Sequence, residues 1–526
     1  MKQTDAVVAN LNDLQDGVRQ VTVGKTDVLL VRSLGKYYAV GAYCTHYQAP
    51  LAEGVLSGNH IVCPWHNAYF DITTGSQQEP PGLDSLLTYQ VRVEGENIIV
   101  TVPESSGHRQ PTMAEYNPEL DQRTFVILGA GAAGIHAAET LRVAGYQGRI
   151  VMATADDRLP YDRTWLSKDY FTGKVTSDQL PLRSPEFFQN HNIEVLLKKQ
   201  AVCVDAIAKT ITFADEDKLS YDALLLATGG KPRQLDVTGK DLQNIFTLRS
   251  FSDIEKILAA AGQAKQAVVI GSSFIGMETA SGLRQKGLAV TVVSPDSLPF
   301  KKILGEEIGK VFQQVHESNG VSFKLGRKVT EIVGDGKVET VILDNGDRLD
   351  ADLVVVGIGV QPATEFLQGV ELNPKDQSVP VNEYLQATDS LYAAGDIASF
   401  PDWRTSESTR IEHWRIAAQH GRIAAYNMAG KPVKFKGVPV FWTMQFQFPL
   451  RYVGHAEDWD EIIFNGDLQK QEFIAFYVKD NQVLAAASSQ RDTETAAICE
   501  LLRLNQMPSP EKLRNSDLDL IALLQQ

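Results

Sequence analysis

Short runs of alternating apolar and polar residues fill the N-terminal part of the chain. VRQVTV, VLLVR, YYAVGA and NIIVTV are examples, and Gly, Asn or Pro separates the runs between residues 18 and 102. A period of two, interrupted by turn residues, is typical of short strands that bury one face. We therefore expect a small all-β domain over residues 1–104.

A different periodicity begins at Thr124. The polar, proline-containing stretch before it has no period, so we interpret residues 105–122 as an interdomain linker. TFVIL, the helical pattern GAGAAGIHAAETLRVAG and GRIVMA then follow as strand, helix and strand. The same plan returns in AVVI, FIGMETASGLRQKG and LAVTVV. Two such units predict two Rossmann-like α/β nucleotide-binding domains.

The length of the chain and its final segment complete a multidomain plan. A chain of 526 residues has room for roughly three or four domains. Strand-like runs such as VFWTMQF and FIAFYV return near the end, before a helical, acidic tail. We expect a first nucleotide-binding domain at 123–242 and 356–432, interrupted by a second at 243–355, and a C-terminal α+β domain at 433–526.

Charge and composition narrow the function classes. The net charge of -15 and a pI near 5.2 argue against a nucleic-acid surface, which needs clustered Lys and Arg. No apolar run is long enough to span a bilayer. The opening residues show neither the apolar core of a secretory signal nor an Arg-rich transit pattern. We expect a cytoplasmic protein with no nucleic-acid or membrane partner.

Two short loops each carry one cysteine and one histidine. Cys44-Thr-His46 is followed, after sixteen residues, by Cys63-Pro-Trp-His66. In a Rieske [2Fe-2S] centre two thiolates hold one iron and two neutral imidazoles hold the other. A structural zinc site is the alternative, although zinc fingers usually pair Cys with Cys and His with His. With their flanking residues, these loops resemble the Rieske ferredoxin family across residues 18–102.

The same resemblance predicts a centre of low potential. It places Ala49, Trp65, Ala68 and Phe70 where high-potential Rieske proteins carry a disulfide and hydroxyl donors to the sulfurs. Hydrogen bonds to sulfur stabilise the reduced cluster, so their loss points to a midpoint near about -150 mV, the low end of the Rieske range.

The first glycine fingerprint, Gly129-Ala-Gly131-Ala-Ala-Gly134, follows a strand and opens a helix. In that context the glycines allow a tight turn, and the helix N-terminus meets a pyrophosphate. LPYDR with LSK, LLLATGG, and LYAAGDI follow along the chain. Together these motifs resemble the ferredoxin-reductase and apoptosis-inducing-factor branch of the pyridine-nucleotide-dependent flavoproteins. The domain order, HWRIAAQHGRIAAYNM and VFWTMQF bring the chain nearest to the apoptosis-inducing factor 3 group, which carries a Rieske domain.

The resemblance implies that the first domain binds FAD. The residues expected to contact it are Gly129, Gly131, Ala132, Ala133, Gly134, Arg163, Lys168, Thr228, Gly229, Arg233, Gly395 and Asp396. It also implies three aromatic side chains near the isoalloxazine, His413, Trp414 and Trp442, for which simple core packing is the alternative.

The resemblance assigns the second domain to NAD(P)H. The residues expected there are Gly271, Ser273, Phe274, Ile275, Gly276, Glu278, Gly357 and Gly359, with Ser273 in place of the middle glycine. It also places Lys168 and Glu278 by the flavin as catalytic residues, where a cation stabilises negative charge on reduced FAD. A surface ion pair is the alternative for these two side chains.

The choice between NADH and NADPH stays open. The ribose-binding acid usual after the second strand is missing from both units, where Thr154 and Ser294 stand. Asp296 is an alternative partner for a free 2'-hydroxyl, whereas Lys301 and Lys302 follow shortly after. We favour NADH from the resemblance alone.

These observations predict an enzyme that passes electrons from NAD(P)H through FAD to its own Rieske centre. His46 and His66 would form the outer edge from which a one-electron acceptor takes the electron. The alternatives are an NADH-responsive redox sensor of apoptosis-inducing-factor type and a Rieske domain that serves only as a docking module. The acceptor, the oligomeric state, with a homodimer as one alternative, and the placement of the Rieske domain stay open.

Overall fold

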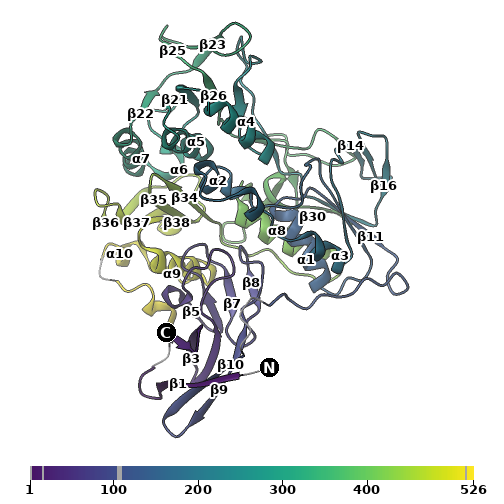
Figure 1. The fold of residues 1–526 in the computed structure, drawn as a ribbon, viewed down its shortest axis with the longest axis vertical. Coiled ribbons are helices and arrows are strands. Elements are labelled where there is room, and N and C mark those ends of the chain that lie inside the picture. The colour runs from purple at the N-terminus through teal and green to yellow at the C-terminus, as the bar shows by residue number, and fades with distance from the viewer. Residues whose placement is uncertain (1–2, 15–16, 104–108, 516–517, 526) are drawn as a thin grey trace.

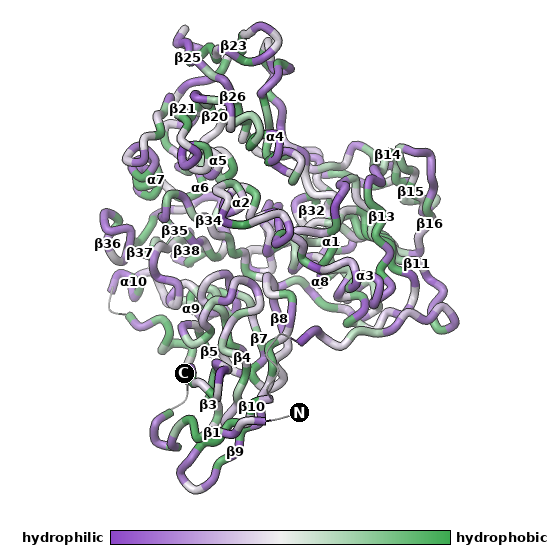
Figure 2. The backbone as a smooth tube through the Cα atoms, viewed as in Figure 1, coloured by the Kyte–Doolittle hydropathy of each residue, from purple (hydrophilic) through white to green (hydrophobic). Residues whose placement is uncertain are grey.

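The computed structural model describes residues 3–14, 17–103, 109–515 and 518–525. Figure 1 shows the N-terminal β unit at one end of the molecule, beside the C-terminal unit and below the two α/β units. Apolar stretches follow many strands of the sheets, whereas many connecting loops at the periphery are hydrophilic (Figure 2). The multidomain plan of β, α/β and α+β units is therefore confirmed. The expected boundary at residues 104 and 105 lies outside the described residues.

The N-terminal unit consists of two antiparallel sheets. The larger has the order β1 (Gln3–Asn10), β10 (Asn97–Pro103), β9 (Thr88–Glu94), β4 (Lys36–Gly41), β3 (Thr26–Ser33) and β2 (Gly17–Val23). The smaller has the order β5 (Val55–Ser57), β6 (His60–Val62), β7 (Tyr69–Asp71) and β8 (Gln77–Glu79). The sequence pattern predicts most of the larger sheet, but it gives no strand before residue 18, so β1 is an addition.

The first α/β unit has a mostly parallel sheet. Its order is β13 (Ile193–Leu196), β12 (Arg149–Ala153), β11 (Thr124–Leu128), β17 (Ala223–Leu226), β31 (Leu391–Ala393) and β30 (Gln386–Thr388). All four residues of β17 are buried, as expected for a central parallel strand covered on both faces. Helices α1 (Ala132–Val143) and α8 (Trp414–Met428) pack so closely that a Cβ at Gly421 would lie 2.1 Å from the Ala133 carbonyl oxygen.

The second α/β unit repeats this plan between the two parts of the first. Its order is β19 (Ile245–Thr247), β26 (Leu353–Val356), β20 (Gln266–Ile270), β21 (Ala289–Ser294) and β22 (Val321–Leu325). Helices α4 (Phe251–Ala261), α5 (Phe274–Gln285) and α7 (Glu306–Ser318) accompany the sheet. A small antiparallel sheet of β23 (Val329–Val333), β24 (Thr340–Leu343) and β25 (Arg348–Asp350) adjoins it, at the top of Figure 1.

The C-terminal unit is an antiparallel sheet with two helices. Its order is β34 (Val440–Gln445), β35 (Phe448–Gly454), β38 (Gln482–Ser489), β37 (Glu472–Lys479) and β36 (Glu461–Asp467), with α9 (Asp492–Arg503) and α10 (Pro510–Leu513). It shares a hydrophobic cluster with the N-terminal unit, in which Val62 and Tyr69 pack with residues such as Val440 and Ile498. The two units therefore form a joint core.

A buried arginine joins the N-terminal unit to the rest of the molecule. Arg415, on α8, is 1% exposed and donates hydrogen bonds to the carbonyl oxygens of Pro80 at 3.0 Å, Asn67 at 2.9 Å and Val438 at 3.1 Å. Burying a charge is costly unless every donor finds a partner. The N-terminal unit is therefore tied to α8 by a guanidinium whose three nitrogens each donate a hydrogen bond.

None of the helices in the described part of the chain is long and apolar enough to cross a membrane.

We predict that replacing Arg415 with methionine will destabilise the protein by about 3 kcal/mol, because buried carbonyl groups lose a charged donor. Urea unfolding followed by fluorescence measures this loss. Arg149→Met is the matched control, because Arg149 forms an exposed pair with Glu194 that should contribute less than about 1 kcal/mol. Equal stability of the two variants would contradict the role given to Arg415.

Candidate functional site

A cavity of about 980 Å³ lies where the two α/β units and the C-terminal unit meet. Most residues expected to bind nucleotides line it. These are Gly129, Gly131, Ala132, Ala133, Arg163, Lys168, Thr228, Gly229, Ser273, Phe274, Ile275, Glu278, Gly357, Gly359, Gly395, Asp396, His413, Trp414 and Trp442. The structure thus brings both fingerprints and the three aromatic side chains to one space.

Four of the expected residues do not line the cavity. Gly134, Gly271 and Gly276 lie beneath the fingerprint loops, where they pack against backbone. Arg233 is exposed, and its Nε donates to the Val360 carbonyl oxygen at 3.2 Å. The structure therefore places Arg233 outside the lining of the cavity.

The glycines of the first fingerprint have separate roles. Gly129 adopts a φ of +114°, and a Cβ there would lie 2.2 Å from the Ala227 carbonyl oxygen. A Cβ at Gly134 would lie 2.0 Å from the Gly129 carbonyl oxygen. A Cβ at Gly131 would meet nothing within 4 Å, and the N-terminus of α1 that it precedes has no side-chain cap. Gly129 and Gly134 thus shape the turn, while Gly131 leaves room beside free N–H groups, which is where a pyrophosphate binds.

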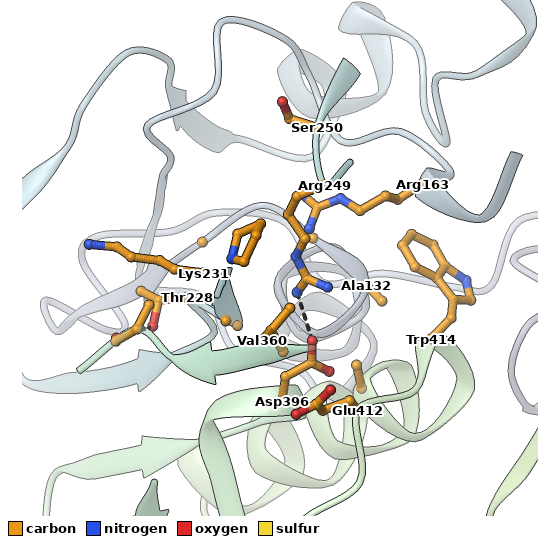
Figure 3. Close-up of a pocket in the computed structure, with 18 of the residues that line it drawn as sticks. Ala132, Arg163, Thr228, Lys231, Arg249, Ser250, Val360, Asp396, Glu412 and Trp414 are labelled. Atoms are coloured by element: carbon orange, nitrogen blue, oxygen red, sulfur yellow. Dashed lines mark hydrogen bonds and ion pairs between the residues drawn. The ribbon is translucent and has the colours of Figure 1, made fainter. Parts of the chain in front are cut away.

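Two arginine side chains make one side of the cavity positively charged. Arg249 donates to Asp396 Oδ2 at 2.7 Å (Figure 3), and the Nε atoms of Arg163 and Arg249 are buried without a hydrogen-bond partner among the described residues. Burial lowers the pKa of Arg163, and the charge of nearby Arg249 lowers it further. An anionic ligand would satisfy both groups, so the cavity fits the diphosphate of a dinucleotide.

Arg249 is a member of the site that the sequence analysis missed. It precedes α4, where Ser250 and Asp253 form a capping box. Its partner Asp396 is far away in the sequence, and no local motif links the two residues.

Lys168 and Glu278 form a buried pair. Lys168 Nζ donates to Glu278 Oε2 at 2.8 Å, and the Glu278 side chain is only 4% exposed. Ser167 also donates to Glu278, and Thr443 Oγ1 donates to its Oε1 at 2.6 Å. The ion pair considered from the sequence is therefore present, but it lines the cavity instead of the outer surface, and Thr443 of the C-terminal unit contacts its Glu278.

The second fingerprint repeats the glycine geometry of the first. A Cβ at Gly271 would lie 2.2 Å from the Gly357 carbonyl oxygen, and one at Gly276 would lie 2.2 Å from the Gly271 carbonyl oxygen. Ser273 stands at the N-cap of α5 without capping it, and its hydroxyl donates instead to the Gly357 carbonyl oxygen at 3.4 Å. A serine therefore fits at this loop position.

The charged residues that follow β21 form a pair outside the lining of the cavity. Ser294 Oγ accepts from the Asp296 N–H at 3.2 Å, and Lys302 Nζ lies 2.7 Å from Asp296 Oδ1. The carboxylate is therefore paired with an exposed cation.

The two Cys/His loops of the N-terminal unit converge. Cys44 and Cys63 are each 1% exposed, and His46 Nδ1 lies 3.1 Å from His66 Nδ1. The N–H groups of His46 and Tyr47 donate to the Cys44 sulfur, and a second pair of N–H groups donates to the Cys63 sulfur. Burial lowers the pKa of His66 well below its usual value, so its imidazole is neutral, as metal ligation requires.

These side chains fit a two-iron cluster. Each iron takes two protein ligands, so the thiolates and imidazoles need not surround one point. Among the described residues no three His, Cys, Asp or Glu side chains gather in a group that could hold a single metal ion. The sulfur-directed N–H groups are the donors that stabilise negative charge on cluster sulfurs.

The imidazoles lie against the wall of the cavity and are largely shielded from solvent. The ring centroids of His66 and Trp442 lie 4.1 Å apart, and Trp442 lines the cavity. His66 is 8% exposed, and the side chain of His46 is 9% exposed. The expectation that these two histidines form the outer edge of the protein is wrong, because the reductase units cover them.

Comparisons with known proteins agree with this architecture. Residues 4–90 match the model of the Rieske [2Fe-2S] domain, residues 123–421 that of pyridine nucleotide-disulphide oxidoreductases and residues 440–524 that of the reductase C-terminal domain. The chain is 39% identical to human apoptosis-inducing factor 3, over 99% of this chain and 86% of that protein. It is 32% identical to rhodocoxin reductase of Rhodococcus erythropolis, over 76% of this chain and 93% of that protein.

A solved structure extends this similarity to three dimensions. The covalent putidaredoxin reductase-putidaredoxin complex matches with a TM-score of 0.72 and 29% identity, over 77% of this chain and 98% of that chain. The chain therefore belongs to the pyridine nucleotide-disulphide oxidoreductase family, as a ferredoxin-reductase-type flavoprotein that uses FAD and NAD(P)H and carries a Rieske [2Fe-2S] domain.

Proposed function

We propose that this enzyme passes electrons from NAD(P)H through FAD to its own Rieske centre and then to a one-electron acceptor. The observation that carries the proposal is the contact of Trp442 with His66, at 4.1 Å between ring centroids. Trp442 belongs to the wall of the cofactor cavity, and His66 belongs to the Rieske loops. Packed side chains thus connect the two cofactor sites without intervening solvent.

The proposed ligands follow from the geometry. Cys44 and Cys63 would hold one iron, and His46 and His66 the other. The cavity residues around Gly131, Arg163 and Asp396 would hold FAD, and the Ser273 loop with Gly357 and Gly359 would hold the nicotinamide nucleotide. FAD, when bound, accepts a hydride and releases electrons singly.

The side chains around the cavity orient the cofactors and hold charge. Lys168 is held by Glu278 at the cavity wall, and its ammonium group would stabilise negative charge on a reduced isoalloxazine bound there. Burial lowers the pKa of His413 to about 3, so this side chain stays neutral at physiological pH. Its Nδ1 is buried without a partner among the described residues and is free to hydrogen-bond to the flavin.

We propose NADH as the preferred donor. Among relatives, the rubredoxin-NAD(+) reductase of Ectopseudomonas oleovorans is 29% identical over 72% of this chain and 99% of that protein. In this chain Asp296, which follows β21, would accept a hydrogen bond from a free 2'-hydroxyl, which a 2'-phosphate cannot donate. We predict that Asp296→Ala will reduce the preference for NADH over NADPH about tenfold, the change given by about 1.4 kcal/mol. Flavin reduction rates with each nucleotide measure this, and a higher kcat/KM with NADPH in the unaltered enzyme would contradict the proposal.

We predict that NADH alone will reduce both cofactors under anaerobic conditions. Flavin absorbance should fall first, and the EPR signal of a reduced Rieske cluster should follow. Trp442→Ala should slow cluster reduction at least tenfold relative to flavin reduction in the same sample, because it removes the group between the two sites. Trp414→Ala is the matched control, since Trp414 lines the same cavity without a ring contact to His66.

The same experiment separates the alternatives. Flavin reduction without any cluster signal, in a sample that contains iron and sulfide, would overturn the proposed electron path. A long-lived reduced complex that cytochrome c oxidises only slowly would favour an NADH-responsive sensor. Unchanged electron transfer to cytochrome c after His66→Ala would favour a Rieske domain that only docks partners.

We predict that Gly131→Val will fold but lose FAD. The new side chain meets no protein atom at its Cβ, yet it fills the space that a pyrophosphate needs beside α1. Flavin absorbance per chain after gel filtration should fall at least tenfold. Gly262→Ala is the control, because its Cβ would meet only ordinary contacts of 3.6 Å or more. Full flavin content in Gly131→Val would place the dinucleotide elsewhere.

A further inference from the structure

One carboxylate of the reductase lies against a histidine of the Rieske loops. Asp162, in the segment before the 3-10 turn Arg163–Trp165, places its Oδ2 3.8 Å from His46 Nε2. The two side chains are 8% and 9% exposed. His46 Nε2 is buried and has no hydrogen-bond partner among the described residues. Asp162 lines no part of the cofactor cavity, and it touches a candidate iron ligand without being one.

The surroundings of Asp162 keep it ionised and fixed. Its Oδ1 accepts from the Thr164 N–H at 2.9 Å and from the Thr164 hydroxyl at 2.6 Å. Its Oδ2 accepts from Trp165 Nε1 at 3.0 Å and from the Tyr47 hydroxyl at 2.9 Å. Four donors to one carboxylate favour its charged form. Because Tyr47 comes from the Rieske unit, the same bonds fix the distance between Asp162 and His46.

The carboxylate of Asp162 has no lysine or arginine as a direct partner among the described residues. Arg451, near Cys63, pairs with Asp492 at 2.7 Å. Lys168, whose charge also acts on His66, pairs with Glu278. These two cations are each paired with a carboxylate, whereas Arg415 beside Asn67 donates to carbonyl oxygens. A buried carboxylate such as Asp162 is screened little by solvent or salt.

We propose that Asp162 lowers the reduction potential of the Rieske centre while the Rieske unit is docked. Reduction adds one electron to the cluster, and a fixed negative charge beside an imidazole ligand opposes that addition. Asp162 is a positioning residue of the reductase that acts through His46. The inference rests on the proposed function only in requiring a cluster at the Cys/His loops.

The contact between Asp162 and His46 also couples the redox state of the cluster to the docking of the Rieske unit. If Asp162 makes reduction less favourable in the docked state, reduction must make docking less favourable by the same factor. The reduced Rieske unit should therefore hold the reductase less tightly than the oxidised unit. Hydrogen exchange of the loop around Tyr47 should be faster in the dithionite-reduced protein than in the oxidised protein.

The test is a redox titration of the full-length protein, with the cluster followed by EPR. Asp162→Asn keeps the shape and removes the charge, so the equilibrium constant for cluster reduction should rise about tenfold, which is 59 mV for one electron. Tyr47→Phe removes one donor and keeps the charge, and it should shift the midpoint by less than half as much. Asp169→Asn removes a nearby carboxylate whose side chain is 53% exposed, and it should leave the midpoint unchanged.

The outcomes separate this inference from the proposed function. An unchanged midpoint in Asp162→Asn, with the cluster signal intact, overturns the inference and leaves the electron path standing. Equal shifts in Asp162→Asn and Tyr47→Phe also overturn it, because they assign the effect to interface geometry. A normal flavin spectrum with no cluster signal in the unaltered protein overturns the proposed function instead.

Discussion

The position of the Rieske unit depends on the hydrogen bonds of Arg415. This guanidinium is buried, so each of its nitrogens must find an acceptor, and it finds them on Asn67, Pro80 and Val438. Asn67 follows His66 in the second Cys/His loop, and Arg415 follows Trp414 at the start of α8. One side chain thus fixes a ligand loop against the helix that begins at the cofactor cavity. The distance from Trp442 to His66 and the distance from Asp162 to His46 both rely on this arrangement.

Much of the fold could be predicted from local sequence. Strands with one buried face alternate in hydrophobicity, and fingerprint glycines appear wherever the backbone leaves no space for a Cβ, as at Gly134 and Gly276. Strand β1 was missed because only Ala9 among its residues is buried, so its sequence carries little alternation. Its position comes from pairing with β10, a partner far away in the sequence.

The parts of the site that could not be predicted are contacts between distant segments. Arg249 meets Asp396, and Thr443 meets Glu278, only because three units close around one cavity. The orientation of the His46 and His66 side chains is a further example. A Cys/His motif specifies which atoms can hold iron, but only the neighbouring units decide whether the imidazoles face solvent. In this chain those units bury His66. Its imidazole edge therefore packs against the reductase, whereas the sequence led us to expect that it faces an external acceptor.

Fusion of the Rieske unit to the reductase makes electron transfer between them intramolecular. A donor and an acceptor held in one chain meet at a high effective concentration, so the first transfer needs no diffusional encounter. The same docking covers both imidazoles, because the Trp442 ring lies 4.1 Å from that of His66 and 6.1 Å from that of His46 between centroids. A protein acceptor cannot touch the imidazole edge while this interface is closed. Electron exit then requires either passage through the covering side chains or separation of the Rieske unit from the reductase. A carboxylate that disfavours docking of the reduced unit favours separation after the electron has arrived.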